Sequence, residues 1–229
     1  CRCRVFQRFR VLSDRQKQMI PVLGFAVVSQ FDLAERLLAS IDYPVEHLVI
    51  IDNSGTQTWQ PKKPTQVKNL WVMRPPYGLG LVGAWNLIVK STPYAPYWLL
   101  VNDDAHFEPG AMQIIAENAN PSGVGHPVIN PKWTAIVLGE TVVDKVGLYD
   151  ERFYPLYYDD NDYERRCDAA GVKSYTIPAV IHHTNSASIN HERNNNSFAR
   201  NGKLYADKTA NNDNSWTWTL ESRRANRWD

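Results

Sequence analysis

The chain has 229 residues, of which 43% are hydrophobic and 21% are charged. A chain of this length and composition predicts one domain with appendages and enough apolar side chains for a core, which excludes wholesale disorder. Residues 1–18 hold six Arg and Lys against one Asp, which leaves 19 basic and 23 acidic residues in the remainder. The main body is therefore mildly acidic, and we expect no nucleic-acid partner.

Cysteine content and hydropathy suggest where the protein works. Cys1, Cys3 and Cys167 are too few and too badly placed for a disulfide framework or a four-ligand zinc site. No apolar run reaches the roughly 18 residues of a transmembrane segment, and the N-terminus lacks the apolar stretch of a secretory signal. These features predict a cytoplasmic protein. The basic segment 1–18 precedes Met19 and is either a non-native extension or an arm that makes peripheral contact with an anionic membrane or nucleic acid.

From Pro21 onward, short apolar runs alternate with helical patterns. The patterns predict strands over 22–28, 47–51, 69–73 and 97–101, and helices over 32–41, 81–89 and 160–170. Asp32 and Glu35 are spaced like a capping box at the start of the first helix. This alternation is typical of an α/β fold with a mostly parallel central sheet flanked by helices, in which ligands bind outside the carboxyl ends of the strands. We expect the domain to cover 19–189, followed by an irregular, Asn-rich tail over 190–229.

Two polar turns follow predicted strands. Asp52, after the strand 47–51, can accept a hydrogen bond from the imino group of a pyrimidine base, although Asp52-Asn53-Ser54-Gly55 is equally typical of an Asx turn. Asn102-Asp103-Asp104 follows the strand 97–101. Adjacent acids at that place suit Mg²⁺ or Mn²⁺ on a diphosphate, and the alternative is capping of a helix after Pro109-Gly110.

A glycine-rich segment runs from Gly78 into the helix that contains Asn86. Its G-x-G-x-x-G spacing is no dinucleotide fingerprint, because it lies outside the first βα unit. The glycines instead predict close approach of the backbone to a ligand, beside a helix N-terminus that favours anions.

The densest acidic cluster is Tyr157-Tyr158-Asp159-Asp160-Asn161-Asp162 at a predicted helix N-terminus. The helix dipole explains one or two of these acids, but three crowded carboxylates among aromatic rings predict a raised pKa and a general base. The rings suit either the apolar face of a sugar or the core. His182-His183, at the end of another apolar segment, are either metal ligands or ordinary histidines.

In their order along the chain, these motifs resemble the inverting glycosyltransferases of family 2, which have the nucleotide-diphospho-sugar transferase (GT-A) fold. The resemblance spans about 21–208, and within the family it is greatest to the rhamnosyl- and galactofuranosyl-transferase-like proteins of bacteria and phages. It rests on the βα opening at 22–41, Asp52-Asn53-Ser54, 78–86, Asn102-Asp103-Asp104 with Pro109-Gly110, 146–153, 158–162 with Arg165 and Gly171, and His182-His183 with Ser186.

The resemblance implies roles for the matching residues. The donor-nucleotide residues would be Val28, Ser29, Asp52, Asn53, Gly78, Asn86, Asn102 and Asp103. Asp104, with His182 or His183, would hold Mn²⁺ or Mg²⁺, and Asp160 would be the catalytic base beside Asp159. The acceptor side would be supported by Tyr158, Asp162 and Arg165.

The resemblance also implies partners. The donor would be a UDP- or dTDP-linked sugar, and the acceptor a hydroxyl of a glycan, a lipid-linked glycan or a surface or virion glycoconjugate. The place of action would be the cytoplasm, that of the bacterial host if a phage encodes the protein.

Two features depart from the family pattern. Asn102 is a neutral residue at the first position of the DxD motif, and Thr209-Ala210 follow Lys208 where the family usually has Lys-Trp-Gly. These departures favour a carbohydrate-binding module without turnover as one alternative. A nucleotidyltransferase is the other, but the segment 22–29 leads into Gln30-Phe31-Asp32 instead of a basic, Gly-rich loop.

Overall fold

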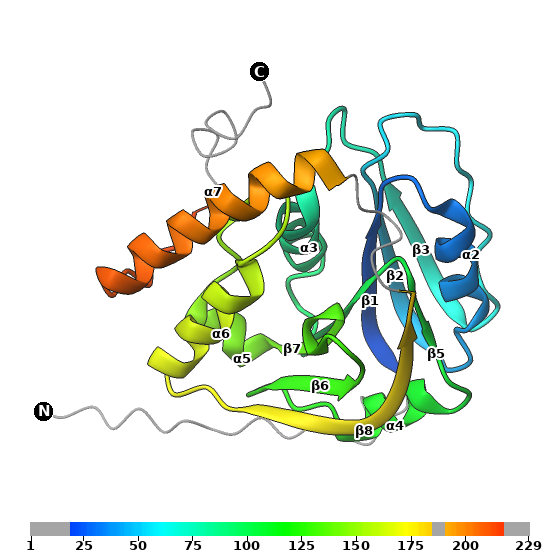
Figure 1. Ribbon diagram of the computed structural model, residues 1–229. Coiled ribbons are helices and arrows are strands. Elements are labelled where there is room, and N and C mark those ends of the chain that lie inside the picture. The colour runs from blue at the N-terminus through cyan, green and yellow to red at the C-terminus, as the bar shows by residue number, and fades with distance from the viewer. Residues whose placement is uncertain (1–18, 185–190, 218–229) are drawn as a thin grey trace, which may run out of the picture.

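The computed structural model describes residues 19–184 and 191–217. The basic segment 1–18, Ser186 and Trp218, on which some of the expectations above depend, lie outside these ranges. The described strands form an eight-stranded sheet in the order β3-β2-β1-β4-β7-β6-β8-β5 (Figure 1). Their bounds are β1 (Ile20–Val27), β2 (Val45–Asp52), β3 (Val67–Met73), β4 (Tyr97–Asn102), β5 (Ala105–Phe107), β6 (Val124–Val128), β7 (Ala135–Gly139) and β8 (Ser174–His183).

Helices cover both faces of this sheet. They are α2 (Phe31–Ala39), α3 (Gly80–Ser91), α4 (Ala111–Asn118), α5 (Glu140–Val146), α6 (Asp159–Ala169) and α7 (His191–Ala210), with 3₁₀ turns η1 (Lys132–Thr134) and η2 (Glu151–Phe153). One core lies between the sheet and α2 and α4, and a second lies between the sheet and α3, α5 and α6. None of the helices in the described ranges is both long and apolar enough to cross a bilayer.

Strand periodicity divides the residues of the sheet between the two cores. In β4, Leu99 and Val101 face the α2 side, whereas Trp98 and Leu100 face the α3 side. Gly24 of β1 allows α3 to approach closely, because a Cβ there would lie 2.6 Å from Ile88 Cγ2. The α/β class and the flanking helices predicted from the sequence are confirmed.

The sheet is parallel in its first half and mixed in its second. Strands β3, β2, β1 and β4 pair in parallel, whereas β7 is antiparallel to both β4 and β6. Strand β8 pairs in parallel with β6 and antiparallel with β5. Two residues of β8, Pro178 and Ala179, are extra relative to β6, because Ile177 pairs with Pro127 and Val180 with Val128. The pattern in the sequence did not reveal these antiparallel pairings.

Two local expectations are wrong. Helix α2 has no side-chain cap, because Gln30 is its N-cap residue and Glu35 accepts a hydrogen bond from Trp59 Nε1 at 2.8 Å instead. The segment expected to be an irregular tail contains α7, a helix of 20 residues that lies along the outside of the α6 and η2 region (Figure 1).

Candidate functional site

The carboxyl ends of β1, β2 and β4 lie side by side. Val27 is in register with Asp52, and Ala26 with Asn102, so the polar turns after β2 and β4 flank the end of β1. Val28 and Ser29, which follow β1, are exposed at this edge. The structure thus assembles these predicted donor-binding residues on one edge of the sheet, where open α/β sheets bind ligands.

Asp52 forms an Asx turn and an ion pair. Its Oδ1 accepts hydrogen bonds from the backbone N–H and the hydroxyl of Ser54, at 3.1 and 2.5 Å. Its Oδ2 lies 3.4 Å from Arg74 Nε, and neither of these two buried atoms has a hydrogen-bond partner among the described residues. Arg74 is not among the site residues that the sequence motifs indicated. Its position directly after β3 could have indicated it, because Met73, the last residue of β3, is in register with Ile51, the residue before Asp52.

Asn53 and the glycine segment form one structural unit. The Asn53 side chain donates to Gly80 O at 3.2 Å and accepts from Leu79 N–H at 3.1 Å. Gly80 has a φ of +70°, and a Cβ there would lie 2.8 Å from Pro155 O, so the backbone approaches another loop of the protein. Gly78 has more space around it, since the atom nearest to a Cβ built there would be Asn53 O, at 3.7 Å.

Asn86 lies inside the protein. Its Nδ2 donates to Tyr149 O at 2.9 Å and to Glu151 Oε1 at 3.1 Å, and its Oδ1 accepts from Tyr149 N–H at 3.0 Å. The residue is fully buried. The structure therefore uses Asn86 to fix the 149–151 segment on α3 and does not bring its side chain to the edge of the sheet.

The acidic turn after β4 leads directly into β5, so the structure contradicts the alternative that these acids cap a helix. Asp104 Oδ1 lies 3.0 Å from His183 Nε2, and both side chains are largely buried. Asp103 is hydrogen-bonded by the backbone N–H of Val28, and burial together with the charge of Asp104 raises the pKa of Asp103 to about 7. The pairing of β5 with β8 brings His183 to this turn, since Ala105 is in register with His183.

The two adjacent histidines separate. His182 lies on the other face of β8, where its Nε2 contacts Glu108 Oε1 and its ring stacks on His106 with 5.0 Å between the centroids. Only His183, of the two predicted metal ligands, therefore lies beside Asp104.

The donor set at Asp104 suits a divalent cation in part. The described residues contain no cluster of three or more His, Cys, Asp and Glu side chains that would enclose a metal ion by themselves. The carboxylate of Asp104 and the imidazole of His183 nevertheless offer oxygen and nitrogen ligands of the kinds that Mn²⁺ accepts. The residues fit a metal that takes its remaining ligands from water or from a bound diphosphate.

The acidic cluster lies at the N-terminus of α6. Asp159 is 7% exposed, and burial followed by the charge of Asp160 raises its pKa to about 7. Burial also raises the pKa of Asp160. The preceding residues, Tyr157 and Tyr158, have φ values of +80° and +64°, which are strained for side chains other than glycine. Strain and perturbed carboxylates at one place are typical of functional sites.

Asp162, expected to support the acceptor side, belongs to a buried ionic network. Arg166 Nε donates to its Oδ2 at 2.8 Å, and Lys208 Nζ of α7 lies 3.0 Å from its Oδ1. Lys208 also donates to Asp150 Oδ2 at 2.6 Å, and Arg152 pairs with the same Asp150. Asp162 and Lys208 are at most 2% exposed, so Asp162 anchors α6 to α7.

Arg165 and Tyr158 also contact the C-terminal segment. Arg165 donates to Asp162 Oδ1 at 3.2 Å and to the backbone oxygen of Asp213 at 2.5 Å. Tyr158 packs on Phe198 and Tyr205 of α7, with ring centroids 5.0 and 5.7 Å apart.

Helix α7 also holds the loop that precedes the acidic cluster. Asn201 is fully buried, and its Nδ2 lies within hydrogen-bond distance of the carbonyl oxygens of residues 153, 154, 156 and 157, at 2.8 to 3.4 Å. Arg200 donates to Tyr154 O. Trp216, whose role the sequence left open, lies against Gly147 and packs on the second core.

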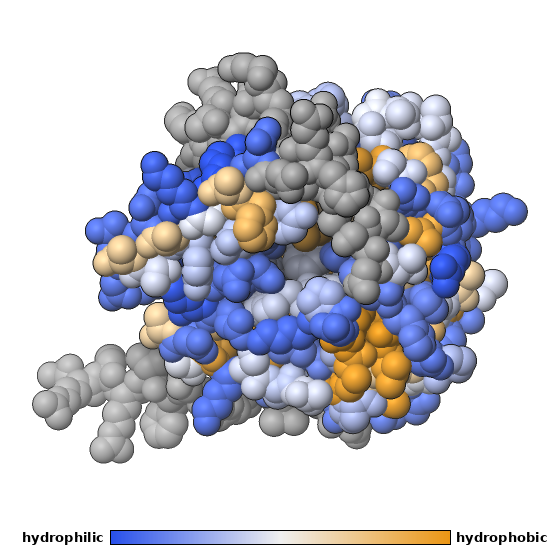
Figure 2. Space-filling model, in the orientation of Figure 1, coloured by the Kyte–Doolittle hydropathy of each residue, from blue (hydrophilic) through white to orange (hydrophobic). Residues whose placement is uncertain are grey.

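A cavity of about 420 Å³ opens between these elements. One wall carries Asn102 at the end of β4, and another carries Asp159 and Asp160. Figure 2 shows the hollow in this face, below the N-terminal half of α7. The remaining lining residues are Leu81, Trp85, Pro131, Trp133, Thr134, Tyr149, Leu156, Tyr157, Tyr158, Asn161 and Phe198.

Comparisons with known proteins agree with this geometry at the level of the fold. No family model and no curated protein matches the sequence. The chain is similar in structure to GalNAc-T7 with UDP, GalNAc and Mn²⁺, with a TM-score of 0.55 and 9% identity over 72% of this chain and 43% of that one. It is also similar to residues 1–349 of S. aureus TarS in complex with UDP-GlcNAc, with a TM-score of 0.58 and 14% identity over 83% of this chain and 66% of that one.

A second TarS structure gives a TM-score of 0.55 and 13% identity over 83% of this chain and 39% of that one. The chain thus spans between 39% and 66% of the lengths of these structures. The fold of the chain is the GT-A fold of glycosyltransferases, as the sequence motifs implied.

Proposed function

We propose that the chain is an inverting glycosyltransferase that transfers a sugar from a nucleoside-diphosphate donor to an acceptor hydroxyl. The observation that carries the proposal is the cavity that joins the two sets of site residues. Asn102 of the acidic turn and Asp160 of α6 lie on its walls, and Asp104, two residues after Asn102 in the same turn, pairs with His183. The GT-A structures cited above include a complex with UDP and Mn²⁺ and another with UDP-GlcNAc, which supports a nucleotide-sugar donor.

The chemistry assigned to Asp160 is that of a general base. Its carboxylate accepts the proton of the acceptor hydroxyl while the hydroxyl oxygen bonds to the anomeric carbon of the sugar. The bond from that carbon to the diphosphate oxygen breaks on the opposite side, which inverts the configuration and releases a nucleoside diphosphate. Burial raises the pKa of Asp160, which makes its carboxylate a stronger base, and the charge of Asp160 in turn adds to the burial that raises the pKa of Asp159.

The donor side uses the edge of the sheet. Asp52, fixed by its Asx turn and by Arg74, faces the nucleobase, and Val28 and Ser29 line the same region. Asp104 and His183 would hold Mn²⁺ or Mg²⁺, which would supply positive charge to the diphosphate. The preferred bases in this proposal are uracil and thymine, the proposed relatives are those of family 2, and the proposed compartment is the cytoplasm.

Calorimetry tests the proposal without knowledge of the acceptor. The protein is titrated with UDP, dTDP and GDP, each with and without Mn²⁺, and we expect metal-dependent binding of a pyrimidine nucleotide. Turnover is measured as hydrolysis of the donor, in which water replaces the acceptor. Asp160→Asn should leave nucleotide affinity nearly unchanged and abolish hydrolysis.

Two results would overturn the proposal. If folded protein binds none of the nucleotides, the carbohydrate-binding module becomes the better explanation, in agreement with the neutral Asn102. If Asp160→Asn loses nucleotide affinity and hydrolysis to the same extent, Asp160 is not the base.

A further inference from the structure

The cavity between Asn102 and Asp160 has an unusual lining. Six of its fourteen lining residues are aromatic, and they come from α3, η1, the loop before η2, the loop before α6 and α7. The aromatic residues are Trp85, Trp133, Tyr149, Tyr157, Tyr158 and Phe198. Aromatic faces of this kind pack well against the C–H groups on one face of a pyranose ring.

The charged side chains that line the cavity are all acidic. Among the lining residues that the structure describes, Asp159 and Asp160 are the only ones of the Asp, Glu, Lys, Arg and His types, so this part of the wall offers no cation to a carboxylate. An anionic sugar would lose its hydration without gaining a partner and would meet two acidic side chains. An uncharged sugar meets neither cost.

The lining also contains unused hydrogen-bonding groups. Ten buried side-chain polar atoms in the described ranges have no hydrogen-bond partner, and five of them belong to residues of this one cavity. The five atoms are Trp85 Nε1, Asn102 Oδ1, Trp133 Nε1, Thr134 Oγ1 and Tyr149 Oη. Buried polar groups are normally paired with protein or with ordered water, so this concentration marks the wall of the cavity as a place where water or the hydroxyl groups of a ligand would supply the missing partners.

We propose that this cavity holds the transferred sugar and selects an uncharged, hydroxyl-rich ring over a uronic acid or another anionic sugar. The aromatic rings bind its apolar face, and the indole N–H of Trp133 and the hydroxyl of Thr134 bind its hydroxyls. This inference rests on the proposed function, because it names the class of sugar that the donor carries.

The test compares two donors that differ at one carbon. UDP-glucose and UDP-glucuronate, or their dTDP counterparts if calorimetry selects thymidine, are titrated with Mn²⁺ beside the free nucleoside diphosphate. We expect the glucose donor to bind about tenfold more tightly than the glucuronate donor, or better. Trp133→Phe and Thr134→Val should each weaken the glucose donor by about threefold or more while leaving the free diphosphate unchanged.

The outcomes separate the two proposals. If no free nucleoside diphosphate binds, the proposed function fails. If the diphosphate binds but the glucuronate donor is bound as tightly as the glucose donor, selection by charge is wrong while the function stands. If both variants keep the affinity for the glucose donor, the assigned hydrogen-bonding groups are wrong.

A second inference comes from different contacts, those of α7. The amide of Asn201 is shared among four carbonyl oxygens of the loop 153–157, and this loop ends at the two strained tyrosines directly before Asp159. A carboxamide nitrogen has only two hydrogens, so the four oxygens share them, and the loop must fold so that these carbonyl groups converge on one buried atom. We infer that Asn201 is a positioning residue that sets the place of Asp160 in the proposed reaction.

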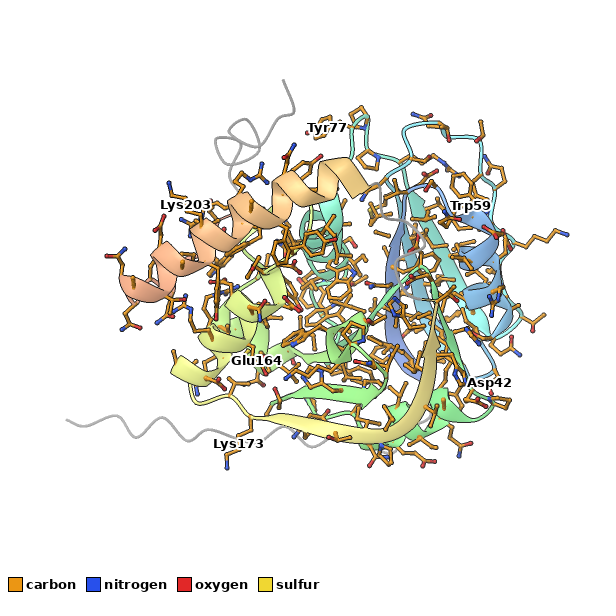
Figure 3. The ribbon with its side chains drawn as sticks, viewed as in Figure 1. Asp42, Trp59, Tyr77, Glu164, Lys173 and Lys203 are labelled. Carbon is orange, nitrogen blue, oxygen red and sulfur yellow. The ribbon has the colours of Figure 1, made fainter. Side chains whose placement is uncertain are left out.

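Replacement of Asn201 tests positioning against general stability. Asn201→Leu should lower kcat of donor hydrolysis by about tenfold or more and shift the acidic limb of its pH profile, with nucleotide affinity unchanged. Arg200→Met removes the bond to Tyr154 O and the bonds to Asn201 Oδ1 but leaves the Asn201 amide nitrogen in place. This variant is expected to fold, and it should show the same effects at smaller size. Lys203→Leu, on the exposed side of α7 (Figure 3), is the matched control.

Equal loss of kcat and nucleotide affinity in Asn201→Leu would indicate a structural role only. Unchanged kcat in both Arg200→Met and folded Asn201→Leu would also overturn the inference. Absence of nucleotide binding in the unmodified protein would instead contradict the proposed function.

Discussion

His182 and His183 are neighbours in the sequence but have different surroundings, because successive side chains of a strand point to opposite faces. His183 meets Asp104 at 3.0 Å, whereas His182 contacts Glu108 and stacks on His106. At the scale of single residues, this difference supplies a matched pair for mutation within one strand.

Loss of His183 should affect metal-dependent binding. We expect His183→Ala to lower the affinity for UDP or dTDP with Mn²⁺ by about tenfold or more, because one of the two proposed protein ligands of the metal is lost. His182→Ala should leave this affinity unchanged. Calorimetric titration of both variants with and without Mn²⁺ measures the effect, and equal losses in the two variants would contradict the assignment.

Asp159 makes stability depend on pH. Its pKa is about 7 in the folded chain, against the ordinary aspartate value of 3.8 that we take for the unfolded chain, so between these values the folded chain binds more protons than the unfolded chain. Stability from this group is therefore complete below pH 4 and is lost as the pH rises through 7. Asp159→Asn, which cannot ionise, should melt roughly 5 °C above the unmodified protein at pH 8.

That difference should shrink toward pH 4, where Asp159 is protonated in the folded chain and about half protonated in the unfolded chain. Thermal unfolding at several pH values checks this, with Asp168→Asn, on the exposed side of the same helix, as control. A difference that is constant across pH would show that ionisation of Asp159 is not its cause.

The sequence could identify a site residue only where the signal for it comes from its immediate neighbours in the chain. Turn residues after apolar runs identified Asp52, Asp103 and Asp104, and crowding at a helix start identified Asp159 and Asp160. The partnership of Asp104 with His183 and of Asp52 with Arg74 depends on which strands are neighbours. Strand order is set by packing of the whole sheet, so one sequence pattern does not contain it.

At the scale of elements, α7 departs most from the sequence expectation. Its sequence is rich in Asn and polar residues, which have modest helix propensity, and apolar periodicity is weak. The helix docks instead through buried polar side chains, with Asn201 on the 153–157 loop and Lys208 between Asp150 and Asp162. A search for apolar stripes misses a helix held in this way, since helical stability comes mainly from tertiary contacts.

Lys208 should therefore be critical for the docking of α7. Lys208→Met leaves two buried carboxylates without this cation, and we expect a loss of roughly 3 kcal/mol in the free energy of unfolding. Lys203→Met, on the exposed side of the same helix, should change it by less than about 0.5 kcal/mol. Urea denaturation measures both, and similar values for the two variants would contradict the role of the buried network.

At the scale of the whole molecule, the candidate site joins the two halves of the sheet. Asp52 ends β2 and Asp104 follows β4, both in the parallel half, whereas His183 ends β8 and Asp160 lies in the first turn of α6, both later in the chain. The overall α/β architecture was predictable from the alternation of elements. The antiparallel insertion of β7 was not, because β7 is a short, fully buried strand whose apolar sequence is compatible with either direction.

Ligand binding should consequently stabilise the molecule as one unit. At about 100 times Kd, UDP or dTDP with Mn²⁺ should add about 2.7 kcal/mol and raise the Tm by about 5 to 10 °C in a single transition. Calorimetric or fluorescence melting checks this, with Mn²⁺ alone as control. Two transitions, of which only one moves, would show that the site lies within one half.

The irregularity in β8 has a consequence for how the sequence can change. Pro178 and Ala179 are two extra residues in β8. Side chains of a strand alternate between its two faces, so an even number of extra residues does not change which face the later side chains occupy. Ile177, Ala179, Ile181 and His183 therefore all lie on the same face. Loss of a single residue there, with the pairing of Ile177 kept, would move His183 into the place that His182 now occupies and turn its side chain to the face away from Asp104. Length variation at this point is therefore expected to occur in steps of two among functional descendants of the chain.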